Sequence, residues 1–219
     1  MRMKLAVCLL LGSAIIGPAL QAGPIENTEP TLEEVRALTN RFQDVNVALA
    51  EGYVRDPSNM CDTAEMMGRP AEYGAMGIHF FRPDLLGLIE GNDRVAGTGT
   101  HTDFREPSIL IYEPQADGTL ELVAVENLVF DAAWEAAGKG PFPTFAGQPY
   151  NAMRDDPATS LDEAHAFAPH HDLHVWLYRA NPRGIFAQFN PVVSCAAHAS
   201  GMAEGEDPRV GHAAHPGHH

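Results

Sequence analysis

Three side chains in the sequence, His79, Glu126 and His174, could together hold a metal ion. Each lies in a stretch with the alternating pattern of a β-strand, in which residues two apart share a face. Glu126 interrupts an apolar row that consists of Leu120, Leu122, Ala124 and Leu128. A carboxylate buried without a partner costs several kcal/mol. Glu126 must therefore be paired, protonated or bound to a metal, unless the strand register breaks there.

Glu113 is a candidate fourth ligand, because it continues the row of Ile109 and Ile111, although its place beside a turn is equally consistent with exposure. Two imidazoles and one or two carboxylates on neighbouring strands would suit Zn(II), Mn(II), Fe(II) or Cu(II). An open coordination position would allow metal-assisted hydrolysis or oxygen chemistry. The alternative is a metal-free network in which His79 and His174 hydrogen-bond to Glu126 or Glu113 and fix the strand register. His170 and His171 precede the strand and are expected to be exposed in a loop, or else to be outer ligands.

A second functional class is a metal-free protein that binds a small apolar ligand. Trp176 and Tyr178 alternate with His174 and would face the same side of the strand. The aromatic residues of the connection 131–170 could cover such a ligand, although tight packing of this long connection is the competing expectation. Nucleophilic hydrolase chemistry is poorly supported, because the chain has neither a GxSxG motif nor a phosphate-binding loop.

Four strands are predicted. Residues 74–81 form one, 108–112 and 120–130 form a hairpin around the Pro and Asp-Gly turn signals of residues 113–118, and a strand follows His171. Asn-Pro signals at residues 181–182 and 190–191 predict turns, with residues 185–189 running back as a hairpin partner.

A helix is predicted from Thr31 to Gly52. Thr31 and Glu34 have the spacing of a capping box, and Gly52 can end the helix. One apolar stripe at steps of three and four is expected to face the core: Leu32, Val35, Leu38, Phe42, Val45 and Leu49.

Residues 1–22 have the pattern of a signal peptide: Arg2 and Lys4, then an apolar run from Leu5 to Ile16, then Leu20-Gln21-Ala22 as a cleavage site. The run is too short to span a membrane. The expected product is soluble and periplasmic or secreted. Cys61 and Cys195 remain after cleavage and most simply form one disulfide in an oxidising compartment, since no Cys/His spacing typical of zinc sites is present.

The charge balance of the chain limits the classes of binding partner that are expected. The chain has 29 acidic and 14 basic residues, with a formal net charge of −15. This balance disfavours nucleic acid and anionic membranes, and it raises the local cation concentration, although acidity alone serves solubility. The expected partner is a metal ion or a small molecule.

The expected fold is a single α+β domain over residues 23–200. It would consist of an N-terminal amphipathic helix packed on an antiparallel β-sheet that could curl into a barrel, closed by one disulfide, with a two-layer sandwich as the runner-up. Residues 201–219 are predicted to be a disordered tail. Its histidines could hold Cu(II), Ni(II) or Zn(II) loosely: His212, His215, His218 and His219.

A series of motifs supports a resemblance. These are MGIHF (76–80), PSILIYEP (107–114), DGTLELVAVEN (117–127), LHVWLYRANPRGIFAQFNP (173–191) and VVSC (192–195). In this order they resemble a functionally uncharacterised family of exported, largely bacterial proteins, over about residues 48–195. The family pattern has Tyr where this chain has Asn127, and often Trp where it has Tyr178 and Phe189. The resemblance implies export but no reaction.

Overall fold

The computed structural model describes residues 29–198. Its centre is a seven-stranded antiparallel sheet in the order β1-β3-β6-β7-β11-β10, with β2 paired to β3 beside this path. The strands are β1 (Val54–Arg55), β2 (Asp62–Thr63), β3 (Ala75–Phe81), β6 (Ile109–Pro114), β7 (Leu120–Phe130), β10 (Asn151–Met153) and β11 (His170–Val175). The short pairs β4 (Leu88–Ile89) with β5 (Ala96–Gly97), and β8 (Thr144–Phe145) with β9 (Gln148–Pro149), lie outside it. The sheet is open, so the predicted α+β class is confirmed and the barrel is not.

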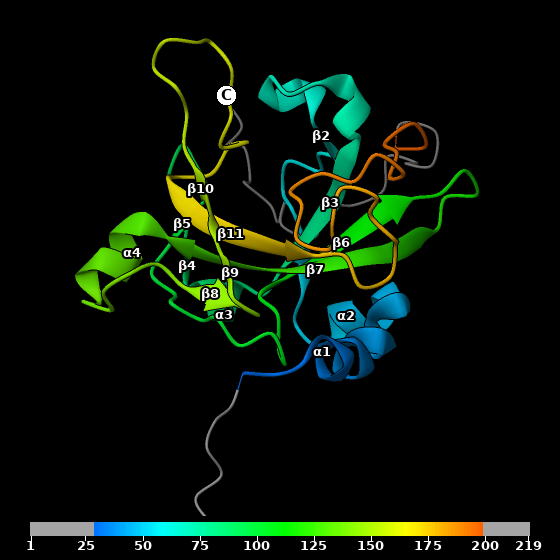
Figure 1. Ribbon diagram of the computed structural model, residues 1–219, viewed down its shortest axis with the longest axis horizontal. Coiled ribbons are helices and arrows are strands. Elements are labelled where there is room, and N and C mark those ends of the chain that lie inside the picture. The colour runs from blue at the N-terminus through cyan, green and yellow to red at the C-terminus, as the bar shows by residue number, and fades with distance from the viewer. Residues whose placement is uncertain (1–28, 199–219) are drawn as a thin grey trace, which may run out of the picture.

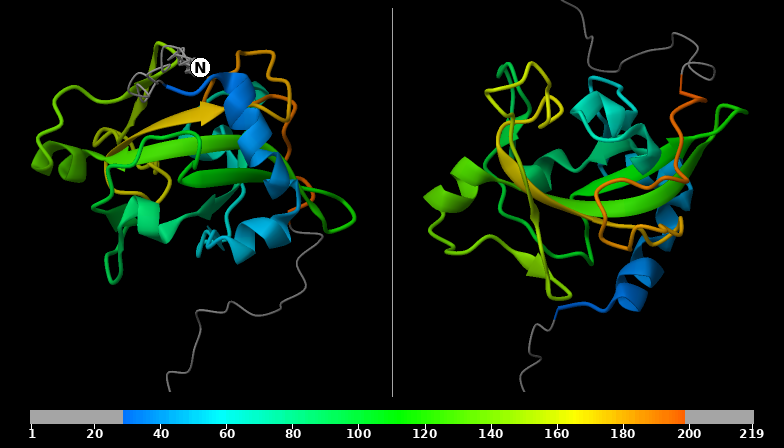
Figure 2. Two further views of the ribbon diagram at one scale, coloured as in Figure 1. Left: turned by 90° about the horizontal axis from the view of Figure 1, so that it is seen from below. Right: turned by 45° about the horizontal axis from the view of Figure 1, so that its top comes forward.

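Both faces of the sheet are covered. Figures 1 and 2 show a curved sheet with α1 (Leu32–Thr39) and α2 (Val45–Ala50) on one face. The core on that face joins Val35 and Phe42 to sheet residues such as Tyr112 and Val125. A second core lies on the opposite face: Phe81, Ile109, Ile111, Ala124, Leu128, Phe167 and Trp176 are among its members. The candidate site belongs to this second face.

The predicted N-terminal helix is interrupted. The capping box of Thr31 and Glu34 is present, but α1 ends at Thr39 and a 3-10 turn, η1 (Asn40–Gln43), follows it. Asp44 then caps α2 by accepting a hydrogen bond from the Asn46 amide at 3.0 Å. An Asp side chain that binds nearby amides favours such a restart over a continuous helix. The change of direction leaves Leu38 and Leu49 exposed, so the expectation that both face the core is wrong.

A β-bulge divides the long strand β7. Ile111 pairs with Ala124 and Tyr112 pairs with Leu122, so Val123 is an extra residue in the ladder. An extra residue moves the following side chains to the opposite face. Leu122 therefore packs in the core beneath the helices, whereas Ala124 lies in the core of the second face. The apolar row predicted around Glu126 is therefore divided between the two faces: Leu122 lies on the helix face, and Ala124 and Leu128 lie on the second face.

The predicted hairpin after β11 does not form. Residues 185–189 contain no strand, and the Trp176 amide donates to the Ile185 carbonyl at 2.9 Å. The connection between β7 and β11 contains α4 (Asp131–Ala136) and β10, and α3 (Pro83–Leu86) follows β3. None of the helices in residues 29–198 is long and apolar enough to cross a membrane. The predicted signal peptide and histidine-rich tail lie outside the described residues.

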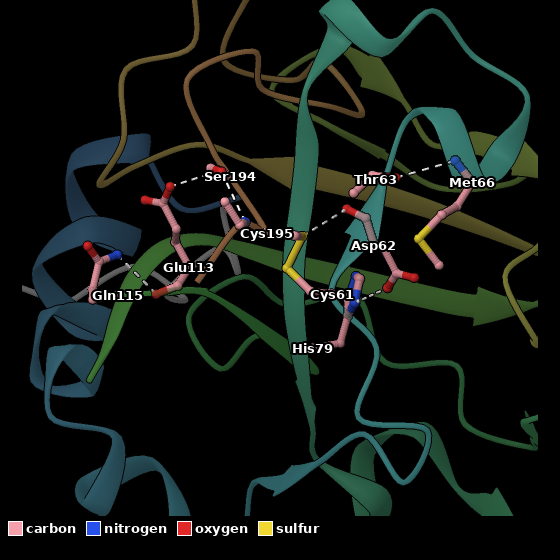
Figure 3. Close-up of a disulfide and its surroundings, with 10 residues drawn as sticks. Cys61, Asp62, Thr63, Met66, His79, Glu113, Gln115, Ser194 and Cys195 are labelled. Carbon is pink, nitrogen blue, oxygen red and sulfur yellow. Dashed lines mark hydrogen bonds and ion pairs between the residues drawn. A yellow bond between two sulfur atoms is a disulfide. The ribbon is translucent and has the colours of Figure 1, made fainter. Parts of the chain in front are cut away.

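The disulfide predicted from cysteine counting is confirmed. Cys61 and Cys195 are bonded, with their Cα atoms 5.7 Å apart and a sequence separation of 134. The bond ties the segment beside β2 to the end of the described chain (Figure 3).

Candidate metal centre

Three strands place the predicted ligands on one face of the sheet. Glu126 on β7 lies directly opposite His174 on β11 in the antiparallel ladder. On the other side of β7, Glu126 pairs with Ile109 of β6, and Ile111 of β6 pairs with His79 of β3. His79, Glu126 and His174 are called the first set below. Strand alternation brings them together, as the sequence predicts.

The distances in the first set fit shared ligands better than hydrogen bonds. The Glu126 Oε2 atom lies 3.4 Å from His79 Nε2 and 3.4 Å from His174 Nε2. An N–H···O hydrogen bond has its heavy atoms about 2.7–3.2 Å apart. Two ligands bonded at about 2.0–2.1 Å to one tetrahedral ion lie about 3.3 Å from each other. The three side chains are at most 1% exposed, and one ligand atom from each lies within 4.8 Å of the others.

Asp62 supports the first set from behind His79. Its Oδ2 atom lies 2.9 Å from His79 Nδ1, and both side chains are buried. Figure 3 shows Asp62, the neighbour of Cys61, with its carboxylate turned toward His79. This contact leaves His79 Nε2 facing Glu126. A carboxylate behind a ligating histidine fixes the orientation of the ring and raises its basicity.

The contacts of His79 with its neighbouring carboxylates favour a positive charge on its ring. Burial lowers the pKa of His79, but its contacts with Asp62 and Glu126 outweigh burial and hold that pKa well above the ordinary value. Burial raises the pKa of Asp62, yet the contact with His79 outweighs it, so the pKa of Asp62 is lowered. The two buried carboxylates, one at each nitrogen of the His79 ring, thus favour either a proton on His79 or a metal ion at its Nε2 atom.

A second set of ligand atoms, from His165, His170 and Asp172, adjoins the first. His170 Nε2 lies 3.7 Å from Asp172 Oδ2, and both side chains have no exposed surface. His165 is 5% exposed. Its ring centroid lies 5.9 Å from that of His79 and 5.6 Å from that of His170. Burial lowers the pKa of His165 to about 4, which leaves the neutral imidazole that binds metals.

Sequence reasoning missed Asp62, His165 and Asp172, and the expected exposure of His170 and His171, the alternative to their being outer ligands, is wrong. β11 begins at His170, so His170, Asp172 and His174 alternate on one face. That pattern is visible in the letters HHDLH and would have placed His170 and Asp172 on the face of His174. His171 faces the other way, where its Nδ1 atom lies 2.7 Å from Asp131 Oδ1. Asp62 begins the two-residue strand β2, which is too short to give a sequence pattern, and His165 lies in a turn whose path the sequence does not reveal.

Glu113 does not join the first set. Its Oε2 atom lies 2.7 Å from an Arg179 guanidinium nitrogen, and its Oε1 atom accepts a hydrogen bond of 2.8 Å from the Ser194 amide. Figure 3 shows the Glu113 carboxylate turned toward Ser194. By strand alternation Glu113 shares the face of Ile109 and Ile111, but it lies four residues beyond Ile109, the partner of Glu126, and so about 13 Å along the strand from the first set. The fourth group near His79 is Asp62 instead.

Trp176 and Tyr178 do not share a face as predicted. β11 ends at Val175, and Trp176 packs in the core of the second face with its indole N–H donating to the Ala187 carbonyl at 2.6 Å. Tyr178 packs toward the helices, where its hydroxyl donates to the Arg36 carbonyl at 2.8 Å. Because the indole N–H and the phenol hydroxyl both hydrogen-bond to backbone carbonyls, the structure does not support a ligand pocket between these two side chains.

The chain was compared with protein-family models, curated proteins and solved structures, and it matches none of them.

Proposed function

We propose that this chain is an exported metalloprotein that holds a divalent transition-metal ion at His79, Glu126 and His174. The observation that carries the proposal is the pair of 3.4 Å separations between Glu126 Oε2 and the two Nε2 atoms, in a fully buried place. Neither nitrogen of His174 has a hydrogen-bond partner among the described residues. Buried polar atoms without partners are rare in native proteins, and a bound ion would satisfy the His174 Nε2 atom, which lies beside Glu126.

Charge supports the same conclusion. Asp62 and Glu126 are buried carboxylates whose ion-pair partners are imidazoles. With neutral imidazoles the site would hold two negative charges in a medium that strongly disfavours them. One divalent ion neutralises both. The acidic surroundings implied by the net charge of −15 would favour the approach of that ion.

The ligand set points to Zn(II) first, then Fe(II), Mn(II) and Cu(II). Two imidazoles and one carboxylate at tetrahedral spacing are typical of zinc sites in which water or substrate takes the fourth position. The same donors with more open positions suit Fe(II) oxygen chemistry. The function is therefore that of a metal centre with an open position, consistent with a metalloenzyme. The resemblance to an uncharacterised exported family, together with the disulfide, supports placement in an oxidising compartment.

The test is elemental analysis of protein exported to a bacterial periplasm. All proteins carry His212, His215, His218 and His219 as alanine, so that the predicted tail contributes no ions. The parent is expected to hold a stoichiometric ion. His79→Gln, Glu126→Gln and His174→Gln should weaken binding more than about 100-fold, beyond the effect of an outer-shell partner.

The matched control is His171→Gln. His171 is a nearly buried histidine of the same strand that contacts a carboxylate but lies outside both sets. It should keep the metal. Circular dichroism confirms that each variant is folded. A parent that stays metal-free after reloading, or first-set variants that keep the parent's metal, would overturn the proposal.

A specific cavity favours a second candidate, the binding of a small apolar molecule. A cavity of about 540 Å³ is lined by apolar residues that include Val54, Phe81, Leu88, Ile89 and Val95. Phe81 lies two residues beyond His79 on β3, and Ala166, which also lines the cavity, follows His165. In this alternative the first set is a buried structural network. Metal-free parent protein that releases an organic ligand on solvent extraction would support it.

A further inference from the structure

We propose that His165, His170 and Asp172 bind a second divalent transition-metal ion, so that the protein holds a two-metal centre. This inference rests on the proposed function, because the first ion supplies the other half of the centre. The second set repeats the donor composition of the first, with two imidazoles and one carboxylate, on the same face of the sheet.

The donor atoms of the second set lack other partners. Both nitrogens of His165, the Nε2 atom of His170 and both carboxylate oxygens of Asp172 are buried without a hydrogen bond to any described residue. Five such atoms in one place are far more than a metal-free network would leave unsatisfied. The 3.7 Å between His170 Nε2 and Asp172 Oδ2 is too long for a hydrogen bond and close to the spacing of two ligands on one ion.

The two histidines are held in place by their backbone surroundings. His170 Nδ1 lies 2.9 Å from the Ala168 carbonyl oxygen, which leaves Nε2 directed toward Asp172. His165 and Ala166 have φ angles of +40° and +67°, in the left-handed region that favours glycine. Such a conformation is unfavourable for residues other than glycine and persists where surrounding structure enforces it, often at functional sites. Here it belongs to the turn that places the His165 ring between His79 and His170.

The two sets are near enough to form one centre. Asp172 and His174 are alternate residues of β11, so their Cα atoms lie about 7 Å apart along one face. The His165 ring is within 6 Å, centroid to centroid, of rings from both sets. Paired ions in metalloenzymes lie about 3.5–4 Å apart and clamp the attacking and leaving oxygens of a displacement.

Charge also requires a second cation. One divalent ion in the first set neutralises Asp62 and Glu126. Asp172 then remains as a buried carboxylate whose ion-pair partner is His170. A second ion would compensate the Asp172 charge and bind one unpartnered atom from each of the three side chains.

The test is a Co(II) titration of metal-free, full-length protein with the four tail histidines replaced by alanine. Visible d–d absorption reports each ion that enters the interior, and equilibrium dialysis counts the ions. The parent is expected to take up two equivalents. His170→Gln and Asp172→Asn should each keep one equivalent, and His171→Gln, the control outside both sets, should keep two.

The outcomes separate the inference from the proposed function. Uptake of no interior ion overturns both. Uptake of one ion that is lost in His174→Gln but retained in His170→Gln leaves the proposed function standing and overturns the second site. Uptake of two ions by both the parent and Asp172→Asn also overturns it. If the second-set variants do not fold, the parent alone decides: electron paramagnetic resonance of the Mn(II)-loaded parent should show two magnetically coupled ions, and uncoupled Mn(II) overturns the two-metal centre.

Discussion

At the scale of single residues, Asp62 is the group whose role is most open to measurement, because it touches a proposed ligand and not the ion. Its contact with His79 Nδ1 fixes which nitrogen faces Glu126. We expect Asp62→Asn to keep the metal but to lower its affinity by about 10–100-fold, since an amide orients the ring less strongly than a carboxylate does. Competition with a chromophoric chelator measures the change.

The matched control for this substitution is Asp131→Asn. Asp131 forms the same kind of carboxylate–imidazole contact with His171, at 2.7 Å, outside both sets. It should leave the metal affinity unchanged. An equal loss of affinity in both variants would show that Asp62 acts through general stability and not through His79.

The sequence predicts the first set because strand alternation needs no knowledge of distant contacts. His79, Glu126 and His174 are each central in a strand, so their faces follow from counting residues. Glu113 shares their face but lies four residues beyond Ile109, the partner of Glu126, and its carboxylate binds Arg179 and Ser194 instead, which counting residues on one strand does not reveal. Asp62 and His165 cannot be placed from the sequence, because the segments that hold them are positioned by the disulfide and by left-handed backbone.

At the scale of elements, β3 depends on a close approach at Gly77. Its φ is +120°, and a Cβ atom there would lie 2.7 Å from the Tyr112 carbonyl oxygen of β6. We expect Gly77→Ala to lower the free energy of unfolding more than Gly184→Ala does, by about 1–3 kcal/mol, the usual cost of overpacking. Urea unfolding measures both variants.

Gly184 is the suitable comparison because it has a φ of +115° with no atom within 4 Å of the added Cβ. The difference between the two variants therefore isolates the steric contact from the backbone preference. Equal losses would mean that β3 and β6 can separate at this point without cost. Because Gly77 precedes His79 by two residues, the Gly77→Ala variant should also bind the first ion less tightly.

The strands are predicted better than the irregular elements, for a physical reason. Residues 75–81 and 120–130 combine β-branched and aromatic side chains with flanking turn residues, which is a local signal. The break in the helix at Thr39 and the missing hairpin at residues 185–189 depend on capping by Asp44 and on packing against Trp176. Those contacts compete with local propensity, and their outcome is decided by tertiary structure.

At the scale of the whole molecule, metal binding and folding should be linked. An ion that binds only the native state raises the apparent stability by an amount that grows with its free concentration. We expect chelation to lower the melting temperature of the parent, and readdition of Zn(II) to restore it. His174→Gln, which loses the first ion, should show a smaller drop in melting temperature on chelation than the parent does, and differential scanning calorimetry tests this. A parent insensitive to chelation despite holding metal would contradict the linkage.

The disulfide also affects the stability of the whole molecule. Closing a loop of 134 residues constrains the unfolded chain by roughly 4–5 kcal/mol in the entropic model. We expect the double variant Cys61→Ser with Cys195→Ser to lose stability of that order in denaturant unfolding. Because Asp62 follows Cys61, the variant should also bind metal less tightly, and an unchanged affinity would show that β2 is held without the bond.

The position of Asp62 next to a half-cystine has a practical consequence for anyone who produces this protein. The bond that anchors the supporting carboxylate closes only where thiols are oxidised. Protein made in a reducing cytoplasm would lack the disulfide that holds Asp62 beside His79. Elemental analysis of that protein would then give a lower metal content than the oxidised protein can bind. The choice of expression compartment thus decides what a metal assay on this protein measures.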